Sequence, residues 1–202
     1  MTLGQEFHGW GFTINDEIEN LRAAQEHLKI VNLGATAIGT TVTAAPGYPE
    51  LAVKNLAELT GIDFKNSEDL IAATSDCGAY MTLSSAIKGL AVKMTKVCND
   101  IRLLASGPRC GLKEINLPQL QPGSSIMPGK VNPVAAEVAN QASFLAIGLD
   151  TTVMLAASAG QLELNVMEPV ITYALYTQMK VMTNACDTLR KKLVEGVTAN
   201  TE

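Results

Sequence analysis

The fold is decided in residues 67–105, which read SEDLIAATSDCGAYMTLSSAIKGLAVKMTKVCNDIRLLA. Large apolar side chains recur there at alternating spacings of three and four, which is typical of a helix that packs at a shallow angle on its neighbours. We expect Asn66 or Ser67 to cap this helix and Gly107-Pro108 to end it. An uninterrupted helix of this length would extend for about 55–60 Å, which indicates a bundle of long helices. The inward face comprises Tyr80, Leu83, Ile87, Leu90, Met94, Val97, Ile101 and Leu104.

Three more periodic patterns predict long helices over about 2–31, 133–159 and 167–194, and a shorter helix is expected near 49–60. No internal repeat or alternating strand pattern is found, so the sequence predicts an all-α fold, with residues 1–202 as one helical bundle domain. The expected inward faces are Ile14, Ile18, Leu21 and Leu28 in the first helix, Val134, Val138, Ala142, Leu145, Leu149 and Thr152 in the second, and Ile171, Leu175, Met182, Ala185 and Leu189 in the third.

The composition limits the kinds of partner. Hydrophobic residues make up 47% of the chain and charged residues only 17%, which favours helices that are buried against other subunits. The formal net charge of −5 offers no basic field for nucleic acid or for an anionic membrane surface. Small solutes are therefore the expected partners.

The cysteines give no sign of a metal centre. Cys77, Cys98, Cys110 and Cys186 are far apart, and no Cys-x-x-Cys pair occurs. We therefore expect neither a zinc site nor a disulfide framework, and no cofactor is predicted. Free thiols suit the cytoplasm. Polar residues interrupt each apolar run before about 18 residues, so no membrane span is expected. The N-terminal residues do not resemble a signal peptide, so export is not expected either.

The segment with the clearest chemistry is the loop 123–133, GSSIMPGKVNP. Gly123 and Gly129 permit backbone conformations that other residues avoid, the two serine hydroxyls and nearby N–H groups can donate, and Lys130 adds a positive charge. Such a loop can close over a small anion. Pro133 is also a suitable first residue for the helix that follows.

This ordered run resembles the signature loop of the aspartase/fumarase superfamily, and the resemblance extends over the whole chain. It implies the central helical domain of that superfamily. The segments Ala73–Tyr80 and Gly160–Pro169 are more similar to the aspartase branch than to the fumarase branch, as is Asn32–Ala35. The other matching landmarks are Met1–Phe7, Asn32–Thr40, Ser106–Arg109 and Glu114–Pro118.

The resemblance implies an ammonia-lyase that acts on L-aspartate. A base removes the proton beside the distal carboxylate, and ammonia then leaves the aci-carboxylate intermediate to give fumarate. By resemblance, Ser124 is the base and Glu137 the acid that partners a family histidine. Glu137 could equally be a first-turn charge that the helix dipole favours. The substrate-binding residues implied in this way are Ser125, Met127, Lys130 and Asn132, of which Met127 is also a candidate packing residue.

Several other residues have simpler interpretations. His8 and His27 are expected to be surface or packing residues, and Arg109 is expected to hold the turn after the long helix. Lys191-Lys192 is expected to be a solvated helix end. The run Gly34–Thr41 lacks the Gly-Lys-Ser/Thr ending of a phosphate-binding loop.

The family context suggests what accompanies these residues. Its members are expected to be homotetramers whose active sites draw on three subunits, with an N-terminal domain that includes a Gly-Arg-Thr-His motif and a small C-terminal domain. Neither domain is recognised in residues 1–202, so we expect the central domain of a longer enzyme that is not competent by itself. The alternatives are a fumarate hydratase and a non-catalytic, self-associating helical domain.

Overall fold

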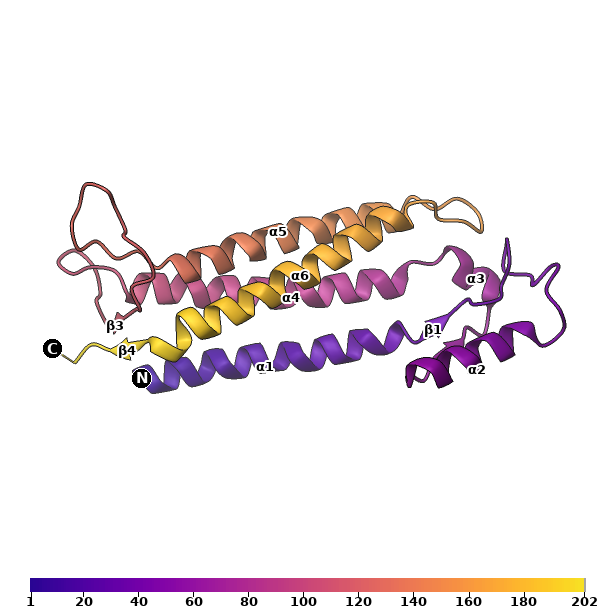
Figure 1. The fold of residues 1–202 in the computed structure, drawn as a ribbon, viewed down its shortest axis with the longest axis horizontal. Helices are drawn as coiled ribbons and strands as arrows, with labels where there is room; N and C mark the ends of the chain where they lie inside the picture. The colour runs from indigo at the N-terminus through magenta and orange to yellow at the C-terminus, as the bar shows by residue number, and fades with distance from the viewer. Residues whose placement is uncertain (202) are drawn as a thin grey trace. The chain divides into compact units, whose positions relative to one another are not determined.

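The computed structural model describes residues 1–201 and confirms the all-α fold (Figure 1). Its strands are only two residues long, which is too short to give an alternating pattern in the sequence. The strand β1 (Ile30–Val31) pairs in parallel with β2 (Lys65–Asn66). The strand β3 (Ile115–Asn116) pairs antiparallel with β4 (Thr198–Ala199). The α-helices are α1 (Leu3–His27), α2 (Tyr48–Thr60), α3 (Leu70–Ser75), α4 (Gly78–Leu104), α5 (Val134–Ala157) and α6 (Glu168–Lys192), followed by a 3-10 helix at Val194–Gly196.

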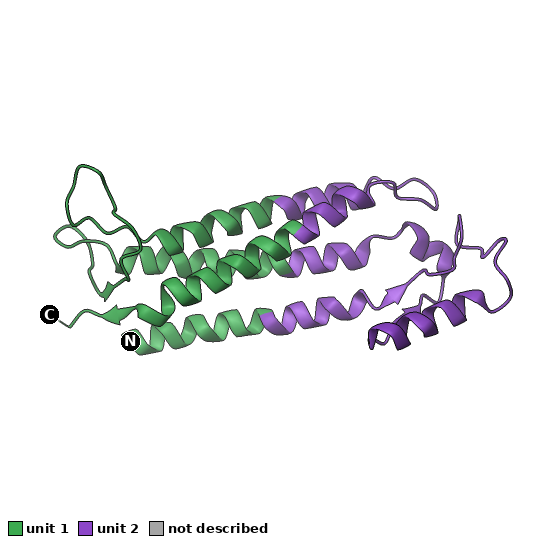
Figure 2. Cartoon of the chain, in the orientation of Figure 1, with its two compact units in different colours: residues 1–17, 87–148, 177–202 green, residues 18–86, 149–176 purple. Residues whose placement is uncertain are grey.

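The chain divides into two compact units, which Figure 2 distinguishes by colour. Unit 1 comprises residues 1–17, 87–148 and 177–202, and unit 2 comprises residues 18–86 and 149–176. The loop 123–133 and the β3–β4 pair belong to unit 1, whereas α2, α3 and the β1–β2 pair belong to unit 2.

The prediction of one helix over residues 67–105 is wrong. The chain is extended at Asp76, so that α3 and α4 are separate helices, and α4 alone has a length of about 40 Å. Asp69 caps α3 by accepting hydrogen bonds from the N–H groups of Ile71 and Ala72, at 2.9 and 3.1 Å. Asp76 accepts from the N–H of Gly78 at 3.2 Å, so a second carboxylate supports the start of α4.

Within unit 1, the expected inward faces of α4 and α6 are confirmed. Met94, Ile101, Met182 and Leu189 are all buried. A polar contact links the helices as well, because the buried Asn140 of α5 donates to the side chain of Asn99 on α4 at 2.8 Å. These contacts give unit 1 a packed helical core.

The expected inward face of α5 is wrong. Val138 and Leu145 are each 49% exposed, whereas a strip of small side chains is buried in their place. Small residues allow neighbouring helices to approach closely, but the hydrophobic periodicity gives them little weight. The buried strip in unit 1 comprises Ala135, Ala136, Ala139, Asn140, Ser143 and Ala146.

The helix α1 ends at His27, earlier than the predicted residue 31, and in unit 1 it buries Trp10 and Glu17. Glu17 forms an ion pair with Lys93 of α4. A Cβ atom at Gly89 would lie 2.8 Å from Oε2 of Glu17, so the glycine makes room for this carboxylate. The pairing satisfies a charge that would be costly to bury alone.

Unit 2 has its own core, in which Asn165 closes the end of α5. Its Nδ2 donates to the carbonyl oxygens of Ala156 and Ala157 at 3.0 and 3.2 Å, and its Oδ1 accepts from the N–H of Met167 at 2.9 Å. The amide therefore satisfies backbone groups at the end of α5 and the start of α6. The buried apolar cluster beside it comprises Cys77, Val153, Ala156, Ile171, Ala174 and Leu175.

Candidate functional site

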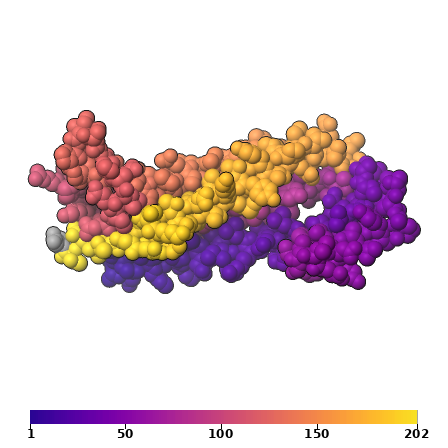
Figure 3. Space-filling model, viewed as in Figure 1, coloured from indigo at the N-terminus to yellow at the C-terminus, as the bar shows by residue number. Residues whose placement is uncertain are grey.

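The loop 123–133 is closed by hydrogen bonds between its ends. The N–H of Gly123 donates to the carbonyl oxygen of Lys130 at 3.0 Å, and Nδ2 of Asn132 donates to the carbonyl oxygen of Gly123 at 3.1 Å. A Cβ at Gly123 would lie 2.4 Å from the carbonyl oxygen of Lys130, so the close approach requires glycine. In the space-filling view, the segment between α4 and α5 projects from the surface of unit 1 (Figure 3).

Ser124 is the polar centre of this loop. Its Oγ accepts hydrogen bonds from the N–H groups of Ile126 and Met127, each at 3.1 Å. Serine side chains commonly make such local bonds to the backbone. Two donors directed at one oxygen also stabilise negative charge on it, so the arrangement suits an alkoxide as well as a hydroxyl.

A cavity of about 530 Å³ lies beside the loop within unit 1, and we call it the loop cavity. Lys130 and Asn132, the pair predicted to bind a carboxylate, both line it. Lys113 and Asn116 line it as well. The sequence patterns did not single out these two residues. The segment Glu114–Pro118, which includes Asn116, was identified only as a segment that resembles the superfamily. No sequence pattern predicted a functional role for Lys113.

The other predicted site residues have different surroundings. Ser125 is exposed and Met127 is 52% exposed. Glu137 is half-buried in the first turn of α5 and lines a second cavity of about 460 Å³, which also belongs to unit 1 and which Thr188 and Lys192 line too. In the described residues, the structure thus brings Lys130 and Asn132 together but places Glu137 on a separate cavity.

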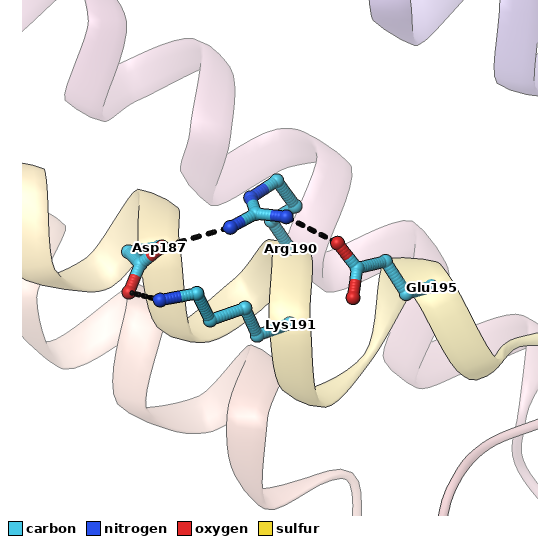
Figure 4. Close-up of polar contacts among 4 residues, drawn as sticks. All are labelled: Asp187, Arg190, Lys191 and Glu195. Atoms are coloured by element: carbon cyan, nitrogen blue, oxygen red, sulfur yellow. Dashed lines mark hydrogen bonds and ion pairs between the residues drawn. The ribbon is translucent and has the colours of Figure 1, made fainter.

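The end of α6 is solvated, as predicted for Lys191-Lys192, and its charged side chains form exposed ion pairs (Figure 4). Asp187 accepts from Lys191 at 2.7 Å and from Arg190 at 3.2 Å, and Arg190 also contacts Glu195. The hydrogen bonds from Lys191 and Arg190 lower the pKa of the Asp187 carboxyl. These exposed pairs add little stability. Lys192 is exposed too, but it also lines the cavity of Glu137.

Unit 2 contains a further cavity of about 500 Å³, which His27, Asp76, Tyr80 and Glu168 line. Its carboxylates have structural explanations, because Asp76 bonds to the start of α4 and Glu168 lies in the first turn of α6. Burial, followed by the nearby Glu168, raises the pKa of the Tyr80 hydroxyl. Among residues 1–201, no group of three or more His, Cys, Asp or Glu side chains could hold a metal ion.

All four cysteines are free, and of these Cys110 is exposed, Cys186 is half-buried, and Cys77 and Cys98 are buried. Burial raises the pKa of the Cys98 thiol to about 12, so this thiol is protonated and unreactive at neutral pH. None of the helices in residues 1–201 combines the length and apolar character needed to cross a bilayer.

A family model described as Lyase matches residues 1–148. The chain belongs to this lyase family. It is 58% identical over 202 residues to the aspartate ammonia-lyase of Escherichia coli strain K12, and the match covers 100% of the chain and 42% of that enzyme. This lyase chain therefore spans less than half the length of the curated relatives that it resembles.

Solved structures with the same fold include two enzymes of this kind. The fumarate lyase:delta crystallin from Brucella melitensis, bound to cobalt, matches with a TM-score of 0.96 and 46% identity, over 99% of the lyase chain and 44% of that protein. A recombinant class II fumarase from Schistosoma mansoni matches with a TM-score of 0.93 and 31% identity, over 99% and 45% of the two chains. These matches confirm the superfamily resemblance and the helical fold class.

Proposed function

We propose that these 202 residues form the central helical domain of an enzyme that converts L-aspartate into fumarate and ammonia. The observation that carries the proposal is the polar geometry of the loop, where two backbone N–H groups bond to Oγ of Ser124 and Lys130 and Asn132 line the adjacent cavity. The 58% identity to an aspartate ammonia-lyase over the whole chain supports the choice of substrate.

In the proposed reaction, Ser124 acts as an alkoxide base. It takes the proton from the carbon beside the distal carboxylate, and the electron pair of that C–H bond moves into the carboxylate to form the doubly charged aci-carboxylate. The carbon–nitrogen bond then breaks as the pair returns, so ammonia leaves and fumarate remains. The two N–H donors stabilise charge on Oγ before the transfer, and fixed donors around the carboxylate stabilise the charge that develops afterwards.

The remaining residues have auxiliary roles in this proposal. Lys130 supplies a charge and Asn132 an amide for a substrate carboxylate. Ser125 donates a hydrogen bond to the intermediate, Met127 flanks the substrate, and Glu137 acts as the acid that partners a histidine. The separate cavity of Glu137 leaves space for such a partner beside Lys192.

The comparisons favour the ammonia-lyase over the two alternatives. The class II fumarase is only 31% identical to the chain, whereas the E. coli aspartate ammonia-lyase is 58% identical. A non-catalytic helical domain would not need Lys130 and Asn132 to line one cavity beside the loop.

A chimaera tests the proposal directly. In it, this chain replaces the matching 202 residues of the E. coli aspartate ammonia-lyase. We expect the chimaera to convert L-aspartate to fumarate at about 1 s⁻¹ or faster, a rate measured by the ultraviolet absorbance of fumarate. The 202 residues assayed alone should be much slower, because proximity lowers a barrier only when all reacting groups are held together.

L-malate provides the control substrate. A chimaera that dehydrates malate faster than it deaminates aspartate would support the fumarase alternative. A folded chimaera with neither activity would count against the lyase proposal and in favour of a non-catalytic domain. Circular dichroism establishes whether the helices are intact.

We also propose that the chain assembles as a homotetramer in the cytoplasm, with active sites shared between subunits. Large apolar side chains on α5 support this assembly, because Phe144 is 57% exposed and Leu145 is 49% exposed. The four free thiols support a reducing compartment. Analytical ultracentrifugation should give a species several times heavier than the 21.4 kDa chain. A stable monomer at micromolar concentration would contradict the proposed assembly.

A further inference from the structure

The strand β4 supports one side of the loop cavity. We call residues 113–117 the cavity wall, because Lys113, Ile115, Asn116 and Leu117 all line the cavity. The wall contains β3, which pairs with β4 inside unit 1 (Figure 1). The chain just before β4 also lies close to the end of the wall, since a Cβ at Gly196 would be 2.6 Å from Cγ of Pro118.

Asn200, the residue that follows β4, bonds to the wall with two groups. Its Nδ2 donates to the carbonyl oxygen of Lys113 at 2.8 Å. Its backbone N–H donates to the carbonyl oxygen of Glu114 at 2.9 Å. The bond from the side chain joins residues that are 87 positions apart in the sequence, so it fixes the wall to a distant part of the chain. The proposed reaction gives Asn200 no role.

The backbone of Lys113 needs such support. Its φ angle is +47°, in the left-handed region that residues other than glycine and asparagine seldom adopt. Such a conformation persists only where the surroundings impose it. The N–H of Lys113 donates to the carbonyl oxygen of Ser106 at 2.7 Å, and Asn200 bonds to its carbonyl group. Asn200 therefore holds one of the two peptide groups of this strained residue.

The signature loop contributes the other polar lining of the cavity and has separate support. Lys130 and Asn132 are held by the bonds that close the loop at Gly123. Asn200 bonds to residues 113 and 114, outside that loop. A change at Asn200 should therefore displace the cavity wall while it leaves the closure of the signature loop intact.

We propose that Asn200 is a positioning residue, which holds the cavity wall in the geometry that turnover at the loop cavity requires. Asn200 acts through the backbone of Lys113 and Glu114 and does not line the cavity itself. The link to turnover rests on the proposed function, whereas the support of the wall rests on the two hydrogen bonds.

Hydrogen exchange of the 202-residue chain, followed by mass spectrometry, tests the support of the wall. The N–H groups of Lys113 and Glu114 donate to the carbonyl oxygens of Ser106 and Leu104. In Asn200→Ala these two amides should exchange about fivefold faster or more, because the wall opens more readily without the side-chain bond. The amides of residues 90–100 in α4 should exchange as in the wild type, which shows that the bundle is folded.

Steady-state kinetics of the chimaera test the link to turnover. Asn200→Ala should lower kcat/KM for L-aspartate about tenfold, with a raised KM, because the displaced wall no longer fits the reacting groups. A merely structural loss of folded enzyme would lower the apparent kcat and leave KM unchanged.

Three further variants separate the amide donor from other effects. Asn200→Asp has the same shape but no N–H donor for the carbonyl of Lys113, so it should resemble Asn200→Ala in both measurements. Asn200→Gln keeps a donor and should retain more activity than either. Asn184→Ala is the matched control, because Asn184 is an exposed asparagine of α6 in unit 1 that does not line the loop cavity. It should behave like the wild type.

The inference is overturned if Asn200→Ala and Asn200→Asp leave the exchange of the wall unchanged, or if their kinetics match those of Asn184→Ala. A fall in apparent kcat with unchanged KM would reduce Asn200 to a structural role and would also overturn it. An inactive wild-type chimaera, together with faster exchange of the wall in Asn200→Ala, would count against the proposed function and not against the support of the wall.

Discussion

Replacement of Ser124 by alanine should lower the kcat of the chimaera for L-aspartate by about 10²- to 10⁴-fold, the range that a positioned general base contributes. The substitution removes the oxygen that accepts hydrogen bonds from Ile126 and Met127. It leaves the loop closure between Gly123 and Lys130 unchanged. We therefore expect fumarate binding to stay near the wild-type level while turnover is lost. This is the pattern of a group that stabilises the transition state of proton transfer and not the bound ligand.

Two variants serve as controls for this prediction. Ser124→Thr keeps the hydroxyl and should retain more activity than Ser124→Ala. Ser158→Ala removes an exposed serine at the end of α5 and should be fully active. Near-native kcat in Ser124→Ala would exclude this serine as the base. An equal loss of fumarate binding and turnover would indicate that the hydroxyl only supports the loop structure.

Gly123→Ala should reduce kcat/KM of the chimaera by about 100-fold, because a displacement of about 1 Å at a reacting group can have that effect. The added Cβ would lie 2.4 Å from the carbonyl oxygen of Lys130. The backbone at residues 123 and 130 must then separate, which breaks their hydrogen bond and displaces both Ser124 and Lys130. Steady-state kinetics with L-aspartate measure the loss.

Gly129→Ala and Gly148→Ala make a matched set with Gly123→Ala. Gly129 has a φ angle of +75°, but no atom lies near an added Cβ, so alanine there introduces conformational strain without a clash. Gly148 lies in α5 with no atom near an added Cβ, and its replacement should preserve or slightly increase stability. If Gly123→Ala is no more impaired than Gly129→Ala, the close contact between residues 123 and 130 does not position the site.

Amphipathic periodicity in the sequence predicted most of the helices. The same periodicity indicates which side of each helix is buried. This worked for α6, where Ile171, Leu175 and Leu189 are buried as predicted. It failed for α5, because the pattern follows the largest apolar residues and the chain buries a strip of alanines. It also missed the separation of α3 from α4, where Asp69 and Asp76 bond to the backbone at the two helix starts.

The sequence by itself determined the all-α class, the superfamily and the position of the loop 123–133, because periodicity and an ordered motif are local properties of the chain. Tertiary structure alone decided which residues share a cavity. Lys113 and Lys130 are separated along the chain, and they line one cavity because the loop between α4 and α5 folds back on itself. Glu137 follows Asn132 closely in the sequence, yet the start of α5 places it on another cavity. Chain proximity therefore did not predict the grouping of polar side chains, because the grouping depends on the path of the backbone between them.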